Sequence, residues 1–248
     1  MIFQTSLIAG LVFSCATAFN PVVKREDSTI ADNQALINEL LSAATAVDRQ
    51  AVFTNNTDFV YDFQNPPAAS AVTKGEGGMT VRADRKVFPA LIGTGVSMTV
   101  GYLGPCGFNT PHVHPRSSEI NIVVQGQLGT QYLLENGAHA IFNTLDQYQM
   151  TVFPQGAVHT EFNPDCTNAV FAAGFASEDP GVQQTAQTLF SLEDDVIAAV
   201  FGDSNVSIDG KDIDTFRPLL PANVALGVES CLTKCGLQRN AKRSLKKM

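Results

Sequence analysis

The sequence predicts a mainly β protein, with one sandwich or barrel of strands lying between helical segments. From Met79 to about Phe175, short runs rich in Val, Ile, Phe and Thr alternate with turns that contain Gly, Pro or Asn. Short strands at regular spacing with such turns are typical of all-β sandwiches and barrels. Apolar residues at helical spacing occur before and after this region. No internal repeat divides the β region.

The length and charge of the chain limit its classes of function. A chain of 248 residues is long enough for one well-cored domain with appendages, or for two small domains. The formal net charge of -8 argues against nucleic acid as a partner, because phosphate recognition requires a basic surface. No apolar stretch is long enough to span a bilayer.

Residues 1–18 are predicted to be a secretory signal peptide. A short apolar run precedes small residues at Ala16 and Ala18, which form an A-x-A cleavage pattern. A buried N-terminal helix is the alternative. Lys24-Arg25 looks like a dibasic processing site, which makes residues 19–25 a candidate propeptide. We therefore expect a secreted, extracellular protein.

The cysteines agree with secretion. Cys15 leaves with the signal peptide, and the remaining four form an even set that permits three pairings. The i, i+4 spacing of Cys231 and Cys235 suits a local bridge at a helix end. That bridge leaves Cys106 to pair with Cys166. Free thiols in a reducing compartment are the alternative.

Two sequons are compatible with export. Asn55 lies in Asn-Asn-Thr and Asn205 in Asn-Val-Ser, which are acceptor patterns for N-linked glycans. Sequons also arise by chance, so they support secretion weakly. We expect glycans at Asn55 and Asn205.

A lead-in and a C-terminal helical segment flank the β region. From Asp32 to Val47 apolar residues recur at helical spacing, and Asp32 can cap the start of this helix. Ser191 is predicted to cap a helix that ends at Phe201, and a further helix spans about 223–236. The predicted organisation is a lead-in with an N-terminal helix at 26–75, the β-barrel at 76–180, C-terminal helices at 181–237 and a basic, flexible tail at 238–248.

Three of the four histidines fall in two strand-turn-strand units. Side chains i and i+2 of a strand share one face, so His112 and His114 project together. Glu119 opens the next strand, and an adjacent antiparallel strand can return its carboxylate beside the two imidazoles. His159 lies on a strand after a second tight turn. His139, in "NGAHAI", has no such partners and is expected in a loop or at an edge.

Residue types and intervals in these two units resemble the two motifs of the cupin superfamily. The stretches "FPALIGTGVSMTVGYL" and "HPRSSEI" are similar to germins and germin-like proteins, and "GPCGFNTPHVHPR" and "ANVALGVESC" to fungal spherulin-type members. The resemblance covers roughly residues 35–237, and it departs at Tyr148, where the family has a turn glycine. It implies a single jelly-roll β-barrel. The motif spacings are Gly107-x4-His112-x-His114-x4-Glu119-x6-Gly126 and Pro154-x-Gly156-x2-His159-x3-Asn163.

By this resemblance a metal ion would be held by His112, His114, Glu119 and His159. Germins are manganese proteins, so the resemblance implies manganese. The donor set also suits other divalent transition metals, such as iron, zinc, nickel or copper. A cluster of satisfied side chains without a metal is the alternative.

The resemblance implies two oxidoreductase activities. One is superoxide dismutation, associated with germin-like proteins. The other is oxidation of oxalate by dioxygen, which yields carbon dioxide and hydrogen peroxide. Asn109 matches one of two asparagines that hold oxalate and is the candidate catalytic residue, in a substrate pocket with Thr99 and Phe108. Thr99 replaces the second asparagine, which weakens the oxalate interpretation, and Asn109 before Thr-Pro is also an ordinary turn residue.

The third class of function is non-catalytic: a metal-binding protein of the cell wall, of stress or of storage, as spherulins suggest. Oligomer state also comes only from the resemblance. Germins assemble as trimers of dimers through barrel edges and C-terminal helices, which implies a trimer or hexamer. A monomer whose helices cover a barrel edge explains the same pattern. A small-molecule substrate is the partner common to both enzyme hypotheses.

Overall fold

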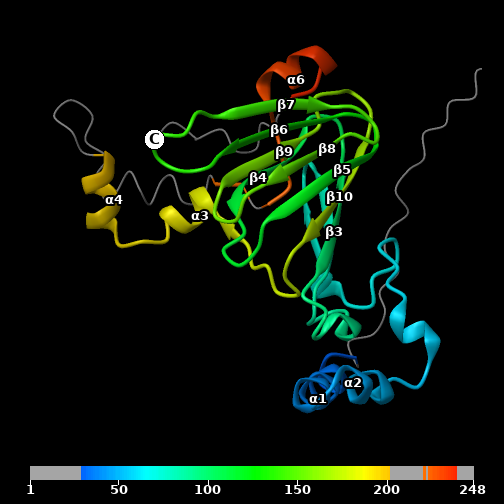
Figure 1. Cartoon of the computed structure of the whole chain (residues 1–248). Coiled ribbons are helices and arrows are strands. Elements are labelled where there is room, and N and C mark those ends of the chain that lie inside the picture. The colour runs from blue at the N-terminus through cyan, green and yellow to red at the C-terminus, as the bar shows by residue number, and fades with distance from the viewer. Residues whose placement is uncertain (1–28, 202–219, 222, 239–248) are drawn as a thin grey trace, which may run out of the picture.

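The computed structural model describes residues 29–201, 220–221 and 223–238, and two antiparallel β-sheets face each other in this part of the chain (Figure 1). The predicted signal peptide, the Lys24-Arg25 site, Asn205 and the tail from residue 239 lie outside these residues. Within them, no helix combines the length and apolar character needed to cross a membrane.

The two sheets confirm the predicted mainly β fold. Short strands β1, β11 and β12 extend it beyond the predicted bounds of 76–180. The first sheet has the order β1 (Val72–Gly75), β2 (Gly78–Ala83), β3 (Ser97–Leu103), β10 (Ala169–Phe175), β5 (Glu119–Gln125) and β8 (Met150–Phe153). The second has the order β11 (Gln183–Gln184), β4 (Gly107–Val113), β9 (Val158–Phe162), β6 (Leu128–Leu133) and β7 (Ile141–Leu145), and β12 (Ala225–Leu226) also pairs with β4.

Strand alternation gives each sheet an inner and an outer face, and β5 shows it clearly. Glu119, Asn121 and Val123 are buried, whereas Ile120 and Ile122 between them are exposed. The inward positions of β5 therefore change from polar to apolar along the strand. The site lies at the polar end.

The apolar core lies between the sheets, beyond Glu119 and Asn121 along β5. Burial of each large side chain contributes about 1.5–3 kcal/mol to folding. This cluster of buried residues is Leu103, Val123, Leu128, Leu145, Phe171, Ala173, Phe175 and Val224.

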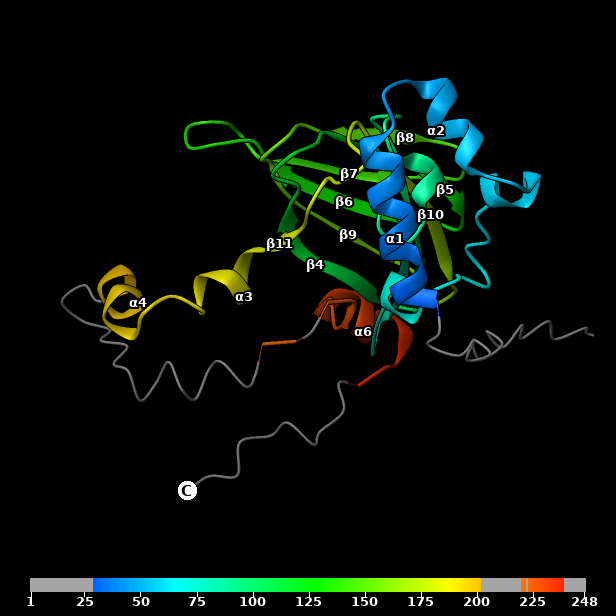
Figure 2. The ribbon, with the colours of Figure 1, turned by 90° about the horizontal axis from the view of Figure 1, so that it is seen from below.

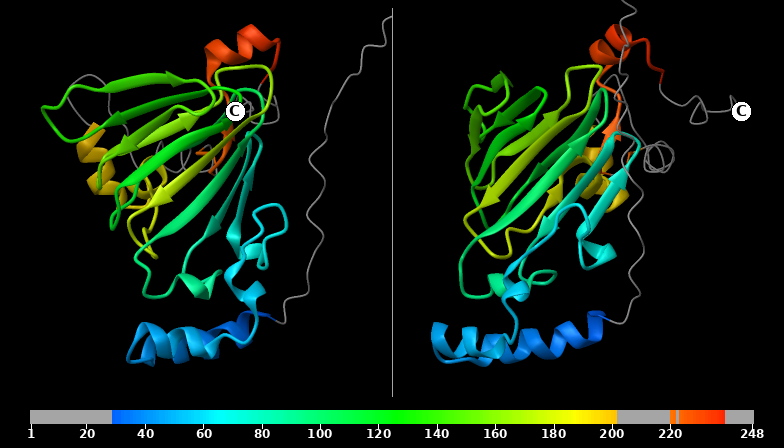
Figure 3. Two further views of the ribbon diagram at one scale, coloured as in Figure 1. Left: turned by 45° about the vertical axis from the view of Figure 1, so that its right-hand side comes forward. Right: turned by 90° about the vertical axis from the view of Figure 1, so that its right-hand side faces the viewer.

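The predicted N-terminal helix is two helices, α1 (Thr29–Ser42) and α2 (Ala46–Val52). Thr45 interrupts the helical run because its backbone is extended, and its hydroxyl accepts from the Asp48 N–H while the Asp48 carboxylate accepts from the Thr45 N–H. Both helices lie at one end of the barrel, opposite α6 (Figures 1 and 3), and α1 runs across that end (Figure 2). Short 3-10 turns at Asn56–Phe59, Ala69–Ala71 and Pro89–Leu91 complete this region.

The C-terminal segment contains α3 (Thr185–Leu189), α4 (Asp194–Phe201) and α6 (Glu229–Cys235). Ser191 does not cap α4, because its hydroxyl donates to the Gln187 carbonyl in the preceding turn. The helix predicted over 223–236 is shorter, because β12 occupies its first part.

The predicted disulfide pairing is wrong. The structure pairs Cys106 with Cys231 and Cys166 with Cys235, both with Cα atoms 5.4 Å apart. Residues four apart share one helix face, so both cysteines of α6 face the barrel. Each finds its partner in a different loop there. The spacing that suggested a local bridge instead docks the helix through two bridges.

Candidate metal centre

Four side chains from three strands meet inside the barrel. His112 and His114 come from β4 and the residue after its end, Glu119 opens β5, and His159 lies on β9, where it pairs with His112. Their exposed fractions are 2%, 8%, 3% and 2%. One atom of each lies within 4.8 Å of all the others. The sequence therefore predicted correctly which residues converge.

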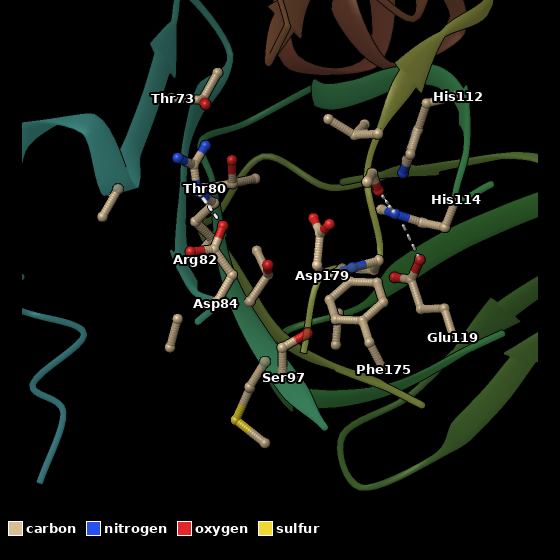
Figure 4. Close-up of a pocket in the computed structure, with 18 of the residues that line it drawn as sticks. Thr73, Thr80, Arg82, Asp84, Ser97, His112, His114, Glu119, Phe175 and Asp179 are labelled. Atoms are coloured by element: carbon tan, nitrogen blue, oxygen red, sulfur yellow. Dashed lines mark hydrogen bonds and ion pairs between the residues drawn. The ribbon is translucent and has the colours of Figure 1, made fainter. Parts of the chain in front are cut away.

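Glu119 is at the centre of the group. Its Oε2 atom lies 3.0 Å from His114 Nε2 and 3.0 Å from His159 Nε2. His112 approaches from β4, with its ring centroid 4.2 Å from that of His159. Figure 4 shows His112, His114 and Glu119 directed toward one another.

Backbone carbonyls fix the orientation of all three rings. In each ring Nδ1 lies against a carbonyl oxygen, those of Thr110, Gly181 and Ala157 in chain order, at 2.9 Å for His112 and 2.8 Å for His159. A carbonyl only accepts, so Nδ1 carries the hydrogen and the neutral ring keeps its lone pair on Nε2. This arrangement is typical of metal-binding histidines.

The donor set fits a metal cation. Three Nε2 lone pairs and one carboxylate oxygen converge. All four atoms are hydrogen-bond acceptors, so they repel one another unless a proton or a cation lies between them. Three imidazoles and a carboxylate suit several divalent transition metals.

Charge and burial set the protonation of the group. Burial and the neighbouring His159 lower the pKa of His112 to about 3. Burial would raise the pKa of Glu119, but His114 and His159, whose Nε2 atoms donate to it when the rings are protonated, outweigh burial and lower the pKa to about 2. Burial would lower the pKa of His159, yet Glu119 and Glu161 raise it above that of an ordinary histidine. His112 is thus neutral and Glu119 ionised at neutral pH.

Two phenylalanines pack against the ligand rings. Phe153 stacks on His159 with centroids 4.3 Å apart, and the Phe175 ring lies 4.7 Å from that of His114. They limit the rotation of the imidazoles and keep water from their sides.

Glu161 is a buried carboxylate beside the cluster that sequence reasoning missed. It follows His159 by two positions on β9, so it faces the same interior, and it is fully buried. Its Oε2 accepts from Asn109 Nδ2 at 3.0 Å and its Oε1 from Asn121 Nδ2 at 2.9 Å. Oε1 also lies 4.0 Å from His159 Nε2. Burial and the charge of Glu119 raise the pKa of Glu161 to about 7. The i+2 spacing from His159 was the signal that could have found it.

The other predicted site residues divide into two groups. Asn109 and Thr99 line the cavity beside the cluster, and Asn109 Nδ2 lies 3.5 Å from His112 Nε2. Phe108 is not among the cavity-lining residues of the described chain, because strand alternation turns it to the face opposite Asn109. His139 is exposed in the loop between β6 and β7, as predicted, and Asn55 is exposed.

The cavity has a volume of about 490 Å³ and reaches three of the four clustered residues (Figure 4). His112, His114 and Glu119 lie on one side, and residues of β2 and β3 line the other. A small molecule in this cavity has direct access to the convergent atoms.

Comparison with known proteins agrees with this architecture. The family model described as Cupin matches residues 64–207. The chain is 43% identical to spherulin-1A of Physarum polycephalum over 204 residues, which cover 81% of this chain and 79% of that protein. It is 31% identical to germin-like protein 12-2 of Oryza sativa subsp. japonica over 220 residues, covering 85% and 91%. A solved recombinant oxalate oxidase in complex with glycolate has a TM-score of 0.53 at 23% identity, covering 68% of this chain and 80% of that one, which shows a shared fold.

Proposed function

Because this chain belongs to the cupin family and is similar to spherulins and germin-like proteins, we propose that it is a secreted, manganese-dependent oxidoreductase that acts on superoxide. One observation carries the proposal: three imidazole Nε2 atoms, held by backbone carbonyls, converge with Glu119 at the side of an accessible cavity. By the same similarity, assembly into a trimer or hexamer is a prediction.

His112, His114, Glu119 and His159 would hold the manganese. When bound, the ion would supply a redox couple, which superoxide dismutation requires because one superoxide is oxidised and another reduced. The choice of manganese rests on similarity to germins, since raw affinity of such donors favours copper or zinc.

The protein's own groups prepare the site for this chemistry. The carbonyl partners fix each Nε2 lone pair toward the centre, and Glu119 supplies a negative charge that offsets a cation. Phe153 and Phe175 cover the rings and confine access to the cavity. A small anion can therefore reach the centre from one side.

Oxalate oxidation is the second candidate, favoured by the Asn109 amide beside His112. Two observations weaken it. The amide of Asn109 donates to Glu161, and Thr99 offers a hydroxyl in place of a second amide. Superoxide requires neither donor, so it remains the proposed substrate.

The test is superoxide decay by the purified secreted protein, with bound metal quantified in the same sample. His114→Ala removes one donor, and His139→Ala, in an exposed loop, is the matched control. We expect a rate that tracks bound manganese, is lost in His114→Ala and is unchanged in His139→Ala. A metal-loaded protein no faster than His114→Ala would overturn the superoxide proposal.

A parallel assay of hydrogen peroxide formation from oxalate and dioxygen separates the two enzymes. Peroxide that depends on oxalate would favour oxalate oxidation. Bound metal with neither activity would favour a structural metal in a wall, stress or storage protein.

A further inference from the structure

The cavity is much larger than superoxide or oxalate requires. Pockets of about 300–1,000 Å³ usually bury whole small-molecule ligands, and this one measures about 490 Å³. Its lining extends from the metal centre on β4 and β5, across β10 and β3, to β2. The side of the cavity farthest from the centre therefore has room for a second part of a ligand.

The register of the first sheet places an arginine on that far side. Arg82 on β2 pairs with Thr99, Thr99 pairs with Ala173, and Ala173 pairs with Asn121. Paired residues share a face, so all four side chains face the interior. Adjacent strands are about 4.8 Å apart, which puts the Arg82 and Asn121 backbones roughly 14 Å apart across three strand spacings. Asn121 follows Glu119 on the inner face of β5.

Small side chains keep the space between these two ends open. Ala173 and Thr99 occupy the register positions between Arg82 and Asn121, and both line the cavity. Larger residues at these positions would fill the interior of the barrel. This row is small in its middle, and the larger Phe171 and Phe175 line the cavity on either side of it.

Arg82 is anchored, but its terminal groups are available. Its Nε lies 2.8 Å from Asp84 Oδ2, and the Tyr61 hydroxyl donates to its backbone carbonyl at 2.7 Å. Within the described chain the structure records no partner for its two Nη groups. Figure 4 shows Arg82 on the wall opposite His114 and Glu119, with the hydroxyls of Thr73 and Thr80 close by.

A guanidinium in this position recognises a planar anion. The Nη groups of arginine match the two oxygens of a carboxylate in a bidentate pair, and the Arg82 side chain, at 39% exposed, leaves them accessible to a ligand. Arg85 and Lys86 also line the cavity, but Asp84, Asp179 and Glu119 balance the three basic side chains. Arg85 is itself paired with Glu178 and Asp179, which leaves Arg82 as the guanidinium with open Nη groups. A carboxylate is therefore the group best suited to this end.

We propose that the cavity binds an organic acid longer than oxalate, with one carboxylate on Arg82 and its other end at the metal centre. This ligand goes beyond the proposed function, because neither superoxide nor oxalate can contact both walls. Its Arg82 end does not depend on a metal.

The experiment is calorimetric titration of the full-length secreted protein with oxalate, malonate, succinate, glutarate and adipate. Arg82→Gln removes the anchor. Lys74→Gln is the matched control, because Lys74 lies on β1 beside Thr73 but is exposed and does not line the cavity. We expect one of the longer acids to bind at least about tenfold more tightly than oxalate. Loss of a charged hydrogen-bond pair weakens binding by about 10- to 100-fold, so Arg82→Gln should lose this preference and Lys74→Gln should keep it.

A second variant removes space rather than charge. Ala173→Met should block the longer acids while leaving Arg82 and its ion pair in place, and thermal unfolding of each variant checks that it is folded. Equal affinities along the acid series in the wild-type protein would overturn the proposal. So would an Arg82→Gln variant indistinguishable from Lys74→Gln.

Metal-free and manganese-loaded protein are titrated in parallel. Arg82-dependent binding to metal-free protein would support the acid site even if the superoxide test fails. Superoxide decay that depends on manganese, with no acid bound in either form, would support the proposed function and overturn the acid site.

Discussion

His159 Nε2 lies 3.0 Å from Glu119 Oε2, while Nδ1 of the same ring contacts the carbonyl oxygen of Ala157. The second contact fixes the neutral tautomer, so the first brings a lone pair against a carboxylate oxygen. A proton or a cation relieves this conflict. The same atoms therefore compete for both, and metal binding is linked to pH.

Metal binding should release a proton from His159. The pKa of His159 is raised above that of an ordinary histidine by Glu119 and Glu161, so the metal-free ring keeps its proton to a higher pH, whereas a bound ion requires the neutral ring. The pKa of Glu119 is about 2, so Glu119 contributes no proton in this range. The pKa of Glu161 is about 7, so the count of released protons is repeated in Glu161→Gln, which removes that source. As pH rises through the raised pKa of His159, the number of protons released on metal binding should decrease and the affinity for the metal should increase. Calorimetry in buffers of different ionisation enthalpy counts the protons, and a count that does not change with pH would contradict this assignment.

Glu161 should be needed to satisfy the buried polar layer next to the ligands. Glu161→Leu leaves the Asn121 amide without an acceptor and Asn109 with only its 3.5 Å contact to His112 Nε2, which should lower the free energy of unfolding by about 1–3 kcal/mol. The cost should be larger below pH 7 than above it, because burial and Glu119 raise the pKa of Glu161 to about 7 and its ionised form destabilises the fold. Denaturant unfolding of metal-free protein measures the change. Glu135→Leu, at an exposed position, is the matched control and should have little effect. Equal stability of the two variants would show that the hydrogen bonds to Glu161 contribute nothing.

The two disulfides should anchor α6 to the barrel. Peptide mapping under non-reducing conditions should recover Cys106 linked to Cys231 and Cys166 linked to Cys235. The first bridge joins residues 125 positions apart, so its replacement by Ala at both positions should cost about 2–5 kcal/mol of unfolding free energy. A Cys231–Cys235 cross-linked peptide would contradict the observed docking of α6.

Local patterns in the sequence indicated which side chains converge, and the resemblance to cupins made them candidate metal ligands. The His112-x-His114 spacing, Glu119 at a strand start and His159 after a tight turn all depend on strand alternation, which acts over a few residues. The same rule applied to His159 also indicates Glu161, and applied to Asn109 it excludes Phe108.

Features set by long-range packing were not predictable in this way. Cys231 and Cys235 pair according to where α6 docks on the barrel, which no local spacing encodes. Arg82 lies across the cavity from Glu119 only because β10 pairs with both β3 and β5 and so joins β2 and β5 in one sheet. The break between α1 and α2 could have been predicted from the sequence, because Thr45 and Asp48 have the spacing of a capping box.

Tyr148 should be replaceable by glycine with a gain in stability. Its φ of 65° lies in the left-handed region, at the position where the cupin motif has a glycine. A left-handed backbone costs a non-glycine residue about 1–2 kcal/mol, and the extra freedom of glycine in the unfolded chain returns about 0.5–1 kcal/mol of this. The side chain is 74% exposed, so little burial is lost, and the Tyr148 N–H to Val123 carbonyl bond is retained. Tyr148→Gly should raise the free energy of unfolding by up to about 1 kcal/mol, measured by denaturant unfolding.

Tyr148→Ala keeps the left-handed backbone strain and serves as the control. A gain in Tyr148→Ala equal to that in Tyr148→Gly would assign the effect to the lost ring rather than to the backbone.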